Sequence, residues 1–324
     1  MRVSYFSLLR ILADGSFHSG ERLGQLLGVS RARVWNLIRR IEALGLRVFK
    51  VRGRGYRLAE SLDLFDRGAI AGQLARSAPE LRIEFLDECP STNTVLAERA
   101  THGAPSGVVL ACERQIDGRG RRGSRWVSVL GGSLAFSILW RFPGGGGSLA
   151  GLSLAVAVGV ARALEQLGMG GISVKWPNDL LCEGRKMGGI LIEVSGEAPG
   201  PSTAVIGVGI NVRLDKVAME RIGQPATDLT HCSGLVPPRS TLLVALLEEF
   251  GRSLARFSRE GFAPFREEWL RRHAWQGRQV ALSHAGRRVA EGRAVDIAED
   301  GALVLESPLG LERFHSGELS LRQR

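Results

Sequence analysis

The sequence is poor in cysteine and lysine and has no long apolar run. Its four cysteines (Cys89, Cys112, Cys182 and Cys232) are scattered without a C-x-x-C pair, which predicts neither a metal site nor a disulfide framework. Such thiols suit a reducing cytosol, so we expect structural cysteines in a cytoplasmic protein. The longest apolar stretch, residues 149–161, is shorter than the roughly 20 residues that a membrane-spanning helix needs. No membrane association is therefore expected.

Positive charge is concentrated in the first part of the chain. The formal net charge is +10, and residues 1–64 contain 12 arginines and lysines against 5 aspartates and glutamates. Only 4 of the 43 basic residues are lysines, so a lysine at a candidate site is informative. A local basic excess points to a polyanion, most simply nucleic acid.

Residues 1–64 predict three short helices followed by a small hairpin. Ser19 and Ser30 stand where helix caps belong, Gly28 permits the turn between two helices, and apolar residues recur with helical period from Val34 to Leu44. The pattern is typical of a winged helix–turn–helix. Arginine pairs with guanine edges, asparagine pairs with adenine edges, and other cations hold phosphates. We expect DNA contacts from Ser30, Arg31, Arg33, Asn36, Arg39, Arg40, Arg52 and Arg54. A charged, solvated helix on a protein-interaction domain is the alternative.

A second basic segment, residues 118–125, contains three glycines and four arginines. Glycine lets the backbone approach an anion closely, and guanidinium groups hold phosphate or carboxylate. Trp126, which follows, offers a flat face for a base. The segment is not a Walker loop, because G-x-x-x-x-G-K-[ST] does not occur, and it is too rich in arginine for a Rossmann fingerprint. It predicts an anion-binding loop, with RNA binding as the alternative from these residues alone.

Two further polar positions lie at predicted strand ends. Ser91, Thr92 and Asn93 stand at a strand-to-helix junction, where they can hold a small polar ligand or simply cap the helix. Lys175 stands at a strand end before a proline turn, where its ammonium can polarise a carboxylate or phosphate oxygen. Both positions are candidate ligand contacts.

Five motifs resemble those of biotin–protein ligases in their order and spacing. They are Pro90-Ser-Thr-Asn, Gln115-x-x-Gly-Arg-Gly-Arg-Arg-Gly, Lys175-Trp-Pro-Asn-Asp, Lys186-Met-Gly-Gly-Ile-Leu-Ile-Glu and Gly207-Val-Gly-Ile-Asn. The N-terminal winged helix makes the chain similar to the bifunctional type, which combines the ligase with a biotin operon repressor. The resemblance covers essentially all 324 residues, and five motifs in register are far more specific than any one of them.

The resemblance implies roles for individual residues. Biotin contacts are implied for Ser91, Thr92, Asn93, Gln115, Arg119, Gly120, Arg121 and Lys175. ATP contacts are implied for Arg121, Arg122, Trp126, Lys175 and Asn211, with Trp126 stacked on adenine. The implied catalytic cations are Lys175, Arg119 and Arg121. Asp117 departs from the family, in which alanine is expected, and a carboxylate at this position can pair with an arginine of the loop.

The implied reaction joins biotin and ATP into biotinyl-5′-adenylate and then transfers biotin to a lysine of another protein. Magnesium is expected with ATP, without a metal site built from protein side chains. The implied partners are the biotin carboxyl carrier protein of acetyl-CoA carboxylase, operator DNA of biotin synthesis genes, and a second copy of the chain when the adenylate is bound. Two alternatives stay open: a ligase-fold regulator that senses biotin without efficient transfer, and a related lipoate-type acyl ligase.

The last fifty residues predict a small β domain. Short strands are expected at 279–282, 287–297, 302–306 and 311–321, with a turn at Asp300-Gly301. The resemblance implies an SH3-like barrel here. The predicted fold class is a multidomain α+β protein with a winged helix–turn–helix at 1–64, a mixed α/β, class II synthetase-like ligase domain at 65–272, and the SH3-like barrel at 273–324.

Overall fold

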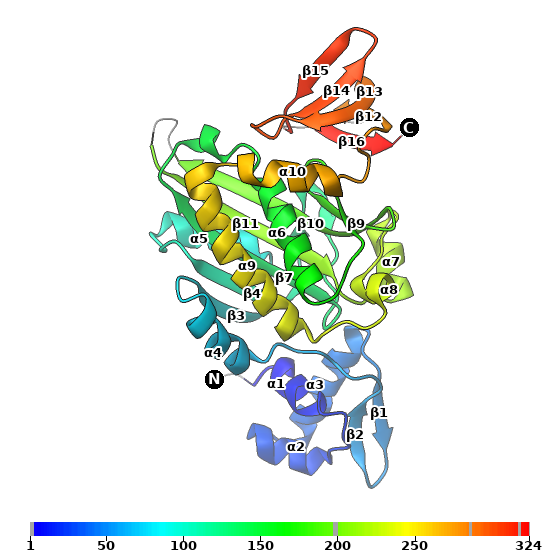
Figure 1. Cartoon of the computed structure of the whole chain (residues 1–324). Helices are drawn as coiled ribbons and strands as arrows, with labels where there is room; N and C mark the ends of the chain where they lie inside the picture. Colours follow the sequence, from blue (N-terminus) through cyan, green and yellow to red (C-terminus); the bar gives the residue numbers. More distant parts are fainter. Residues whose placement is uncertain (1–2, 197–199, 285–286, 317–318, 324) are drawn as a thin grey trace. The chain divides into compact units, whose positions relative to one another are not determined.

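The computed structural model describes residues 3–196, 200–284, 287–316 and 319–323. The chain divides into two compact units, Met1–Phe65 and Asp66–Arg324 (Figure 1). The first unit carries the predicted DNA-binding residues. The second carries every residue predicted to contact biotin or ATP.

The first unit is a winged helix, as predicted. Its elements are α1 (Tyr5–Leu12), α2 (Gly20–Leu27), α3 (Arg31–Ala43), β1 (Val48–Val51) and β2 (Gly55–Leu58). Ser19 and Ser30 cap α2 and α3, and each hydroxyl accepts a hydrogen bond from the backbone N–H three residues later. Gly28 ends α2 in the left-handed conformation, with φ of 63°. The antiparallel pair β1 and β2 forms the wing.

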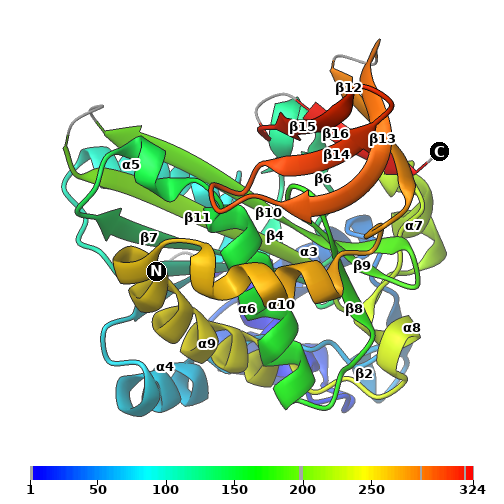
Figure 2. The same cartoon turned by 45° about the horizontal axis from the view of Figure 1, so that its top comes forward.

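A seven-stranded sheet is the framework of the second unit (Figures 1 and 2). Its strands are β3 (Arg82–Cys89), β4 (Val108–Gln115), β7 (Ser133–Phe142), β8 (Ile172–Lys175), β9 (Asp179–Cys182), β10 (Arg185–Gly196) and β11 (Ser202–Asn211). They run in the order β3-β4-β7-β11-β10-β9-β8. The first two are parallel and all other neighbours are antiparallel.

Helices cover both faces of this sheet. They are α4 (Arg67–Ser77), α5 (Thr92–Thr101), α6 (Leu152–Gln166), α7 (Lys216–Ile222), α8 (Leu229–Ser233), α9 (Arg239–Glu260) and α10 (Ala263–Arg272). Leu139 of β7 packs in a buried cluster with Leu96 of α5, whereas Phe136 of β7 packs its ring against Phe250 of α9. Because side chains alternate along a strand, α5 and α9 lie on opposite faces. Figure 2 shows α6 and α10 on the α9 side.

Helix α6 is the core helix of the second unit. By length and composition the segment Gly146–Gln166 is apolar enough to cross a membrane, but 67% of its apolar window is buried inside the protein. It packs against α9 and α10. The apolar stretch 149–161 therefore lies largely within a helix of the protein core.

The end of the chain forms a five-stranded antiparallel sheet. Its strands are β12 (Gln279–His284), β13 (Arg287–Ile297), β14 (Leu303–Ser307), β15 (Gly310–Phe314) and β16 (Leu319–Gln323). The single strand predicted over 311–321 is wrong, because β15 pairs with β14 whereas β16 crosses to the other edge and pairs with β12.

The expectation that the cysteines form no disulfide is wrong for one pair. Cys182, at the end of β9, is bonded to Cys232 in α8, with Cα atoms 6.2 Å apart. The two lie 50 residues apart in the sequence, so spacing alone does not indicate the contact. Cys89 and Cys112 are free and buried, as expected of structural thiols.

Candidate active site

A pocket of about 200 Å³ opens on the second unit. Every residue predicted to contact biotin or ATP lies in its lining. The lining holds six cationic side chains: Arg119, Arg121, Arg122, Arg125, Lys175 and Lys186. Within the part of the chain that the structure describes, Asp179 supplies its only carboxylate. This charge balance suits a ligand that carries several negative charges.

The Ser91-Thr92-Asn93 segment begins α5 at one end of the pocket. Ser91 occupies the N-cap position but its hydroxyl makes no capping hydrogen bond, so the simple helix-cap alternative is wrong. The three side chains are 2–3% exposed. The Oε1 atom of Gln115 accepts hydrogen bonds from the backbone N–H of Thr92 at 2.7 Å and from its hydroxyl at 3.2 Å. The segment is therefore a rigid polar end wall.

Glycines of β11 allow the pocket wall to approach these side chains. A Cβ atom at Gly207 would lie 2.1 Å from Oδ1 of Asn93, and one at Gly209 would lie 2.7 Å from the ring of Trp126. Asn93 in turn donates to the Glu193 carboxylate at 2.9 Å. Larger residues at either glycine would displace the amide or the indole, which explains the Gly-Val-Gly pattern that the sequence shows.

The arginine–glycine loop is more ordered than the sequence predicts. Strands β5 (Gly118–Arg119) and β6 (Arg125–Trp126) pair antiparallel around the 3₁₀ turn η1 (Arg121–Gly123). Arg119 forms an ion pair with Glu193. Arg121 donates to the backbone oxygen of Ser316 at 2.7 Å, and burial together with Arg122 lowers the pKa of its guanidinium. Two of the loop's arginines, Arg119 and Arg121, are thus held in place at the pocket.

The expected partner of Asp117 is wrong. Within the described residues, its exposed carboxylate makes no ion pair with an arginine of the loop. Its backbone N–H donates to the oxygen of Pro90 at 3.0 Å. Glu193, 76 residues further along the chain, pairs with Arg119 instead, because β10 brings that carboxylate beside the loop.

Two lysines share one carboxylate in the pocket. Nζ of Lys175 lies 3.1 Å from Oδ2 of Asp179, and Nζ of Lys186 lies 2.6 Å from Oδ1 of the same residue. Burial opposes ionisation of Asp179, but Lys186 and Lys175 together hold the pKa of the carboxyl below its ordinary value. The aspartate therefore stays charged and fixes both ammonium groups.

Lys186 is a site residue that sequence reasoning missed. It was noted only as the first residue of a motif, but it belongs to β10, with its side chain in the pocket lining. The scarcity of lysine was the available signal, since only 4 are present in 324 residues.

The opposite end of the pocket contains two unpaired polar atoms. Asn211 is 2% exposed and donates to the oxygen of Thr227 at 3.1 Å, yet its Oδ1 has no partner among the described residues. The indole N–H of Trp126 is likewise buried and unpaired. Buried polar atoms normally find partners, so this acceptor and this donor indicate a polar ligand such as a nucleotide base.

The predicted DNA-binding face of the first unit lies on the exposed side of α3. The five predicted α3 residues are exposed, and none of their guanidinium groups forms an ion pair with the described carboxylates. Trp35, which sequence reasoning missed, is 46% exposed on the same helix, and the Arg39 guanidinium lies 4.9 Å from its ring centre. On the wing, Arg54 stacks over Phe17 at 4.4 Å. The DNA contacts themselves stay predictions.

Three family models match successive parts of the chain. They describe an HTH domain at residues 6–57, the biotin/lipoate A/B protein ligase family at 86–211, and the biotin protein ligase C terminal domain at 277–322. The "Bifunctional ligase/repressor BirA" of Escherichia coli is 36% identical over 97% of this chain and 96% of its own length. This chain belongs to the bifunctional biotin ligase/repressor family. The Bacillus spizizenii member is 28% identical over 95% of each chain.

Solved biotin protein ligases share the fold. The Aquifex aeolicus enzyme in complex with biotin and ATP superimposes with a TM-score of 0.65 at 29% identity, covering 75% of this chain and 99% of that one. The predicted membership of the biotin ligase/repressor family, and its three-part architecture, are therefore confirmed. Biotin ligase membership also explains why six cations surround the pocket.

Proposed function

We propose that the chain activates biotin with ATP and transfers it to a lysine of the biotin carboxyl carrier protein of acetyl-CoA carboxylase. The observation that carries the proposal is the pocket itself, in which six cations and one carboxylate of the described residues line a cavity that ends in a buried hydroxyl-and-amide wall. An uncharged ring with polar edges can form hydrogen bonds with that wall, and a triphosphate can pair with the cations.

The first step forms an acyl phosphate. A carboxylate oxygen of biotin attacks the α-phosphorus of ATP, the bond to the bridging oxygen breaks, and pyrophosphate leaves with that electron pair. In the second step the acceptor amine attacks the acyl carbon, AMP leaves, and the amine loses its proton. Negative charge develops first on the phosphoryl oxygens and then on the acyl oxygen, where fixed cations lower the barrier.

We propose separate groups for these tasks. Ser91, Thr92, Asn93 and Gln115, which line the pocket, are proposed for the ureido end of biotin, with Gly120 allowing close approach of the loop. The catalytic cations we propose are Lys175, Lys186, Arg119 and Arg121. Arg122, Trp126 and Asn211 are proposed for the nucleotide, where the unpaired Oδ1 of Asn211 would accept a hydrogen bond from the adenine amino group. No side chain needs to form a covalent intermediate.

Magnesium is proposed to arrive with ATP. No group of three or more His, Cys, Asp or Glu side chains lies close enough to hold a metal ion in the described parts of the chain. Asp179, the pocket carboxylate, is already engaged by two ammonium groups. Phosphate oxygens and water are the ligands that magnesium ordinarily keeps in such sites, and they fit this pocket better than a cage of protein side chains.

The winged helix supports a second role, repression of biotin synthesis genes. We propose that the adenylate-bound chain forms a homodimer in the cytoplasm, so that two copies of α3 reach two half-sites of an operator. The exposed arginines of α3 supply the positive face that such binding needs. A regulator without transfer activity is expected to lack the cations that catalysis needs. All of the predicted catalytic cations are present in this pocket.

The direct test combines the purified chain, ATP, magnesium, labelled biotin and the isolated carrier domain. Covalent label on the carrier that depends on ATP and on its acceptor lysine is the expected result. A carrier with that lysine replaced by arginine is the control. Label transferred equally well from lipoate would favour the lipoate-type alternative, and no transfer of either acid would refute the ligase proposal.

A further inference from the structure

We infer that Trp275, in the connection between α10 and β12, is a positioning residue that holds the Lys175 ammonium for adenylate formation. The inference rests on the proposed ligase function and extends it. The Trp275 ring centre lies 5.1 Å from Nζ of Lys175. An aromatic face attracts an ammonium at this distance through its quadrupole. Lys175 is thus held between the ring and the carboxylate of Asp179.

The carboxylate alone leaves this ammonium poorly fixed. Asp179 is shared, and its contact with Lys186 is the shorter of the two, at 2.6 Å against 3.1 Å. A lysine ammonium sits on a flexible stem with three rotatable donors, so one shared contact leaves several positions open. The ring restricts the ammonium without a hydrogen bond, so the donors that Asp179 does not use stay available for a phosphate or carboxylate oxygen.

The backbone around Trp275 runs directly beside β8. His273 forms a parallel bridge with Val174, and the N–H of Ala274 donates to the oxygen of Val174 at 2.9 Å. This register places Trp275 next to Lys175. One residue further along β8–β9, the indole N–H of Trp176 donates to the oxygen of Gly301 at 3.2 Å. Three consecutive residues, 174 to 176, are therefore each held by the C-terminal part of the chain.

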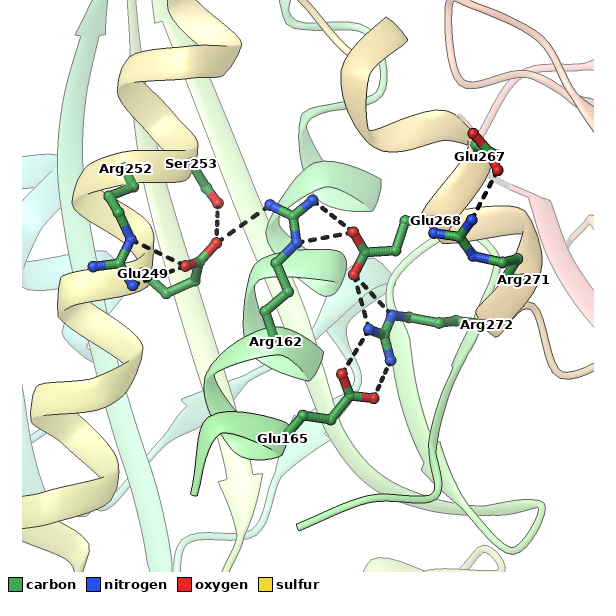
Figure 3. A network of polar contacts seen from close by, with 9 residues as sticks. All are labelled: Arg162, Glu165, Glu249, Arg252, Ser253, Glu267, Glu268, Arg271 and Arg272. Carbon is green, nitrogen blue, oxygen red and sulfur yellow. Dashed lines mark hydrogen bonds and ion pairs between the residues drawn. The ribbon is translucent and has the colours of Figure 1, made fainter. Parts of the chain in front are cut away.

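An ion-pair network fixes the start of this connection. Arg272, the last residue of α10, donates to Glu165 and to Glu268, both at 2.8 Å, and Arg162 of α6 donates to the same Glu268 at 2.9 Å (Figure 3). Figure 3 shows Glu268 between the two guanidinium groups, so α10 is pinned to α6 immediately before His273. The connection that carries Trp275 therefore begins at a fixed helix end, which keeps Trp275 close to Lys175.

The test uses the full chain with Trp275→Leu, Trp275→Phe and Arg278→Ala, the last as an exposed control three residues away. Biotin-dependent exchange of pyrophosphate into ATP is measured, with kcat and the KM for biotin determined separately. Loss of a cation–π contact predicts about a 10-fold fall in kcat for Trp275→Leu with the KM for biotin nearly unchanged. Trp275→Phe should restore most of the rate, and Arg278→Ala should match the parent.

A double variant separates positioning from general structural support. In single-turnover adenylation, Trp275→Leu should add little to the loss caused by Lys175→Met, because the ring acts through that lysine. Additive losses, a rise in KM without a fall in kcat, or failure of Phe to rescue would each overturn the inference. Thermal unfolding of each variant identifies any that fold poorly, and the Phe variant then decides. Absence of exchange in the unmodified chain would instead refute the proposed function.

Discussion

Cationic side chains are held in two different ways in the two units. In the winged helix, Arg39 lies over the Trp35 ring and Arg54 lies over Phe17. In the ligand pocket, carboxylates take the main part: Asp179 holds two lysines, of which Lys175 also lies over the Trp275 ring, and Glu193 holds Arg119. Stacking orients a guanidinium without using its N–H groups, whereas a carboxylate occupies some of them.

This difference matches two kinds of target. Glu42 and Glu60 of the first unit pair with Lys50 and Arg47, which are not among the predicted DNA contacts. The stacked arginines therefore keep their donors for phosphates and base edges spread along DNA. In the pocket, charge develops on only a few oxygens, so cations fixed at defined points stabilise it more effectively.

The sharpest test of the comparison is Lys186→Met. Removing one preorganised cation should lower the adenylation rate by about 10²- to 10³-fold. Binding of the biotin-free chain to double-stranded DNA, measured by fluorescence anisotropy, should stay unchanged because Lys186 lies in the other unit. Lys216→Met on α7, an exposed lysine outside the pocket lining, is the matched control. A loss of less than threefold would show that Lys186 only supports the strand.

A second expected difference is that the stability of the second unit depends on pH through a buried histidine. Burial lowers the pKa of His273 to about 4, although its hydrogen bond with Gln276 partly opposes this shift. The unfolded chain, with a pKa near 6.5, takes up the proton first as pH falls, so stability is complete above about pH 6.5 and declines toward pH 4, by up to about 3 kcal/mol.

Urea unfolding at several pH values checks this expectation. His273→Phe keeps a ring that can stack on Trp269, as His273 does at 4.6 Å, but removes the titrating group. Its free energy of unfolding should therefore fall less than that of the parent between pH 6.5 and pH 4. Identical pH profiles for the two proteins would assign the decline to other groups.

Much of the fold and of the candidate site could be predicted from local sequence. The caps at Ser19 and Ser30 and the glycine at 28 define the winged helix from neighbouring residues alone. The motif residues converge on one pocket because each motif stands at a strand end or a turn, which the sequence marks with glycine, proline or a hydroxyl. Periodicity likewise identified the exposed face of α3.

The missed features depend on contacts between distant segments. Lys186 is the exception in distance, because Asp179 is close in the sequence and the two meet through the register of β9 and β10, which includes a bulge. Trp275 lies 100 residues after Lys175, and the Cys182–Cys232 bond joins a strand to a helix across 50 residues. Local patterns do not encode such pairings. Trp35 is the exception, because its position on the polar side of a predicted helix was visible in the sequence.

The next test removes one arginine of the DNA-binding face. Arg33→Ala should weaken binding to the DNA upstream of the biotin synthesis genes by about 10-fold or more and leave the exchange rate unchanged. Arg47→Ala, whose guanidinium is paired with Glu60, is the control within the same unit and should have little effect. Equal loss of DNA binding and exchange by Arg33→Ala would contradict the separation of the two units' tasks.

The smallest expected effect concerns the stacked pair on α3. Trp35→Ala should weaken the same DNA complex by about 3- to 5-fold, because Arg39 loses the ring that orients it. Trp35→Phe should recover part of this loss. The measurement is a titration at two salt concentrations, since loss of orientation should alter affinity while leaving the salt slope nearly constant. A changed slope would mean that the variant loses phosphate contacts instead.

The most direct test of the central claim is exchange of radiolabelled pyrophosphate into ATP by the purified chain. A pocket built for an acyl adenylate predicts exchange that requires biotin and magnesium and that does not occur when lipoate replaces biotin. No exchange with biotin, or equal exchange with lipoate, would contradict the account.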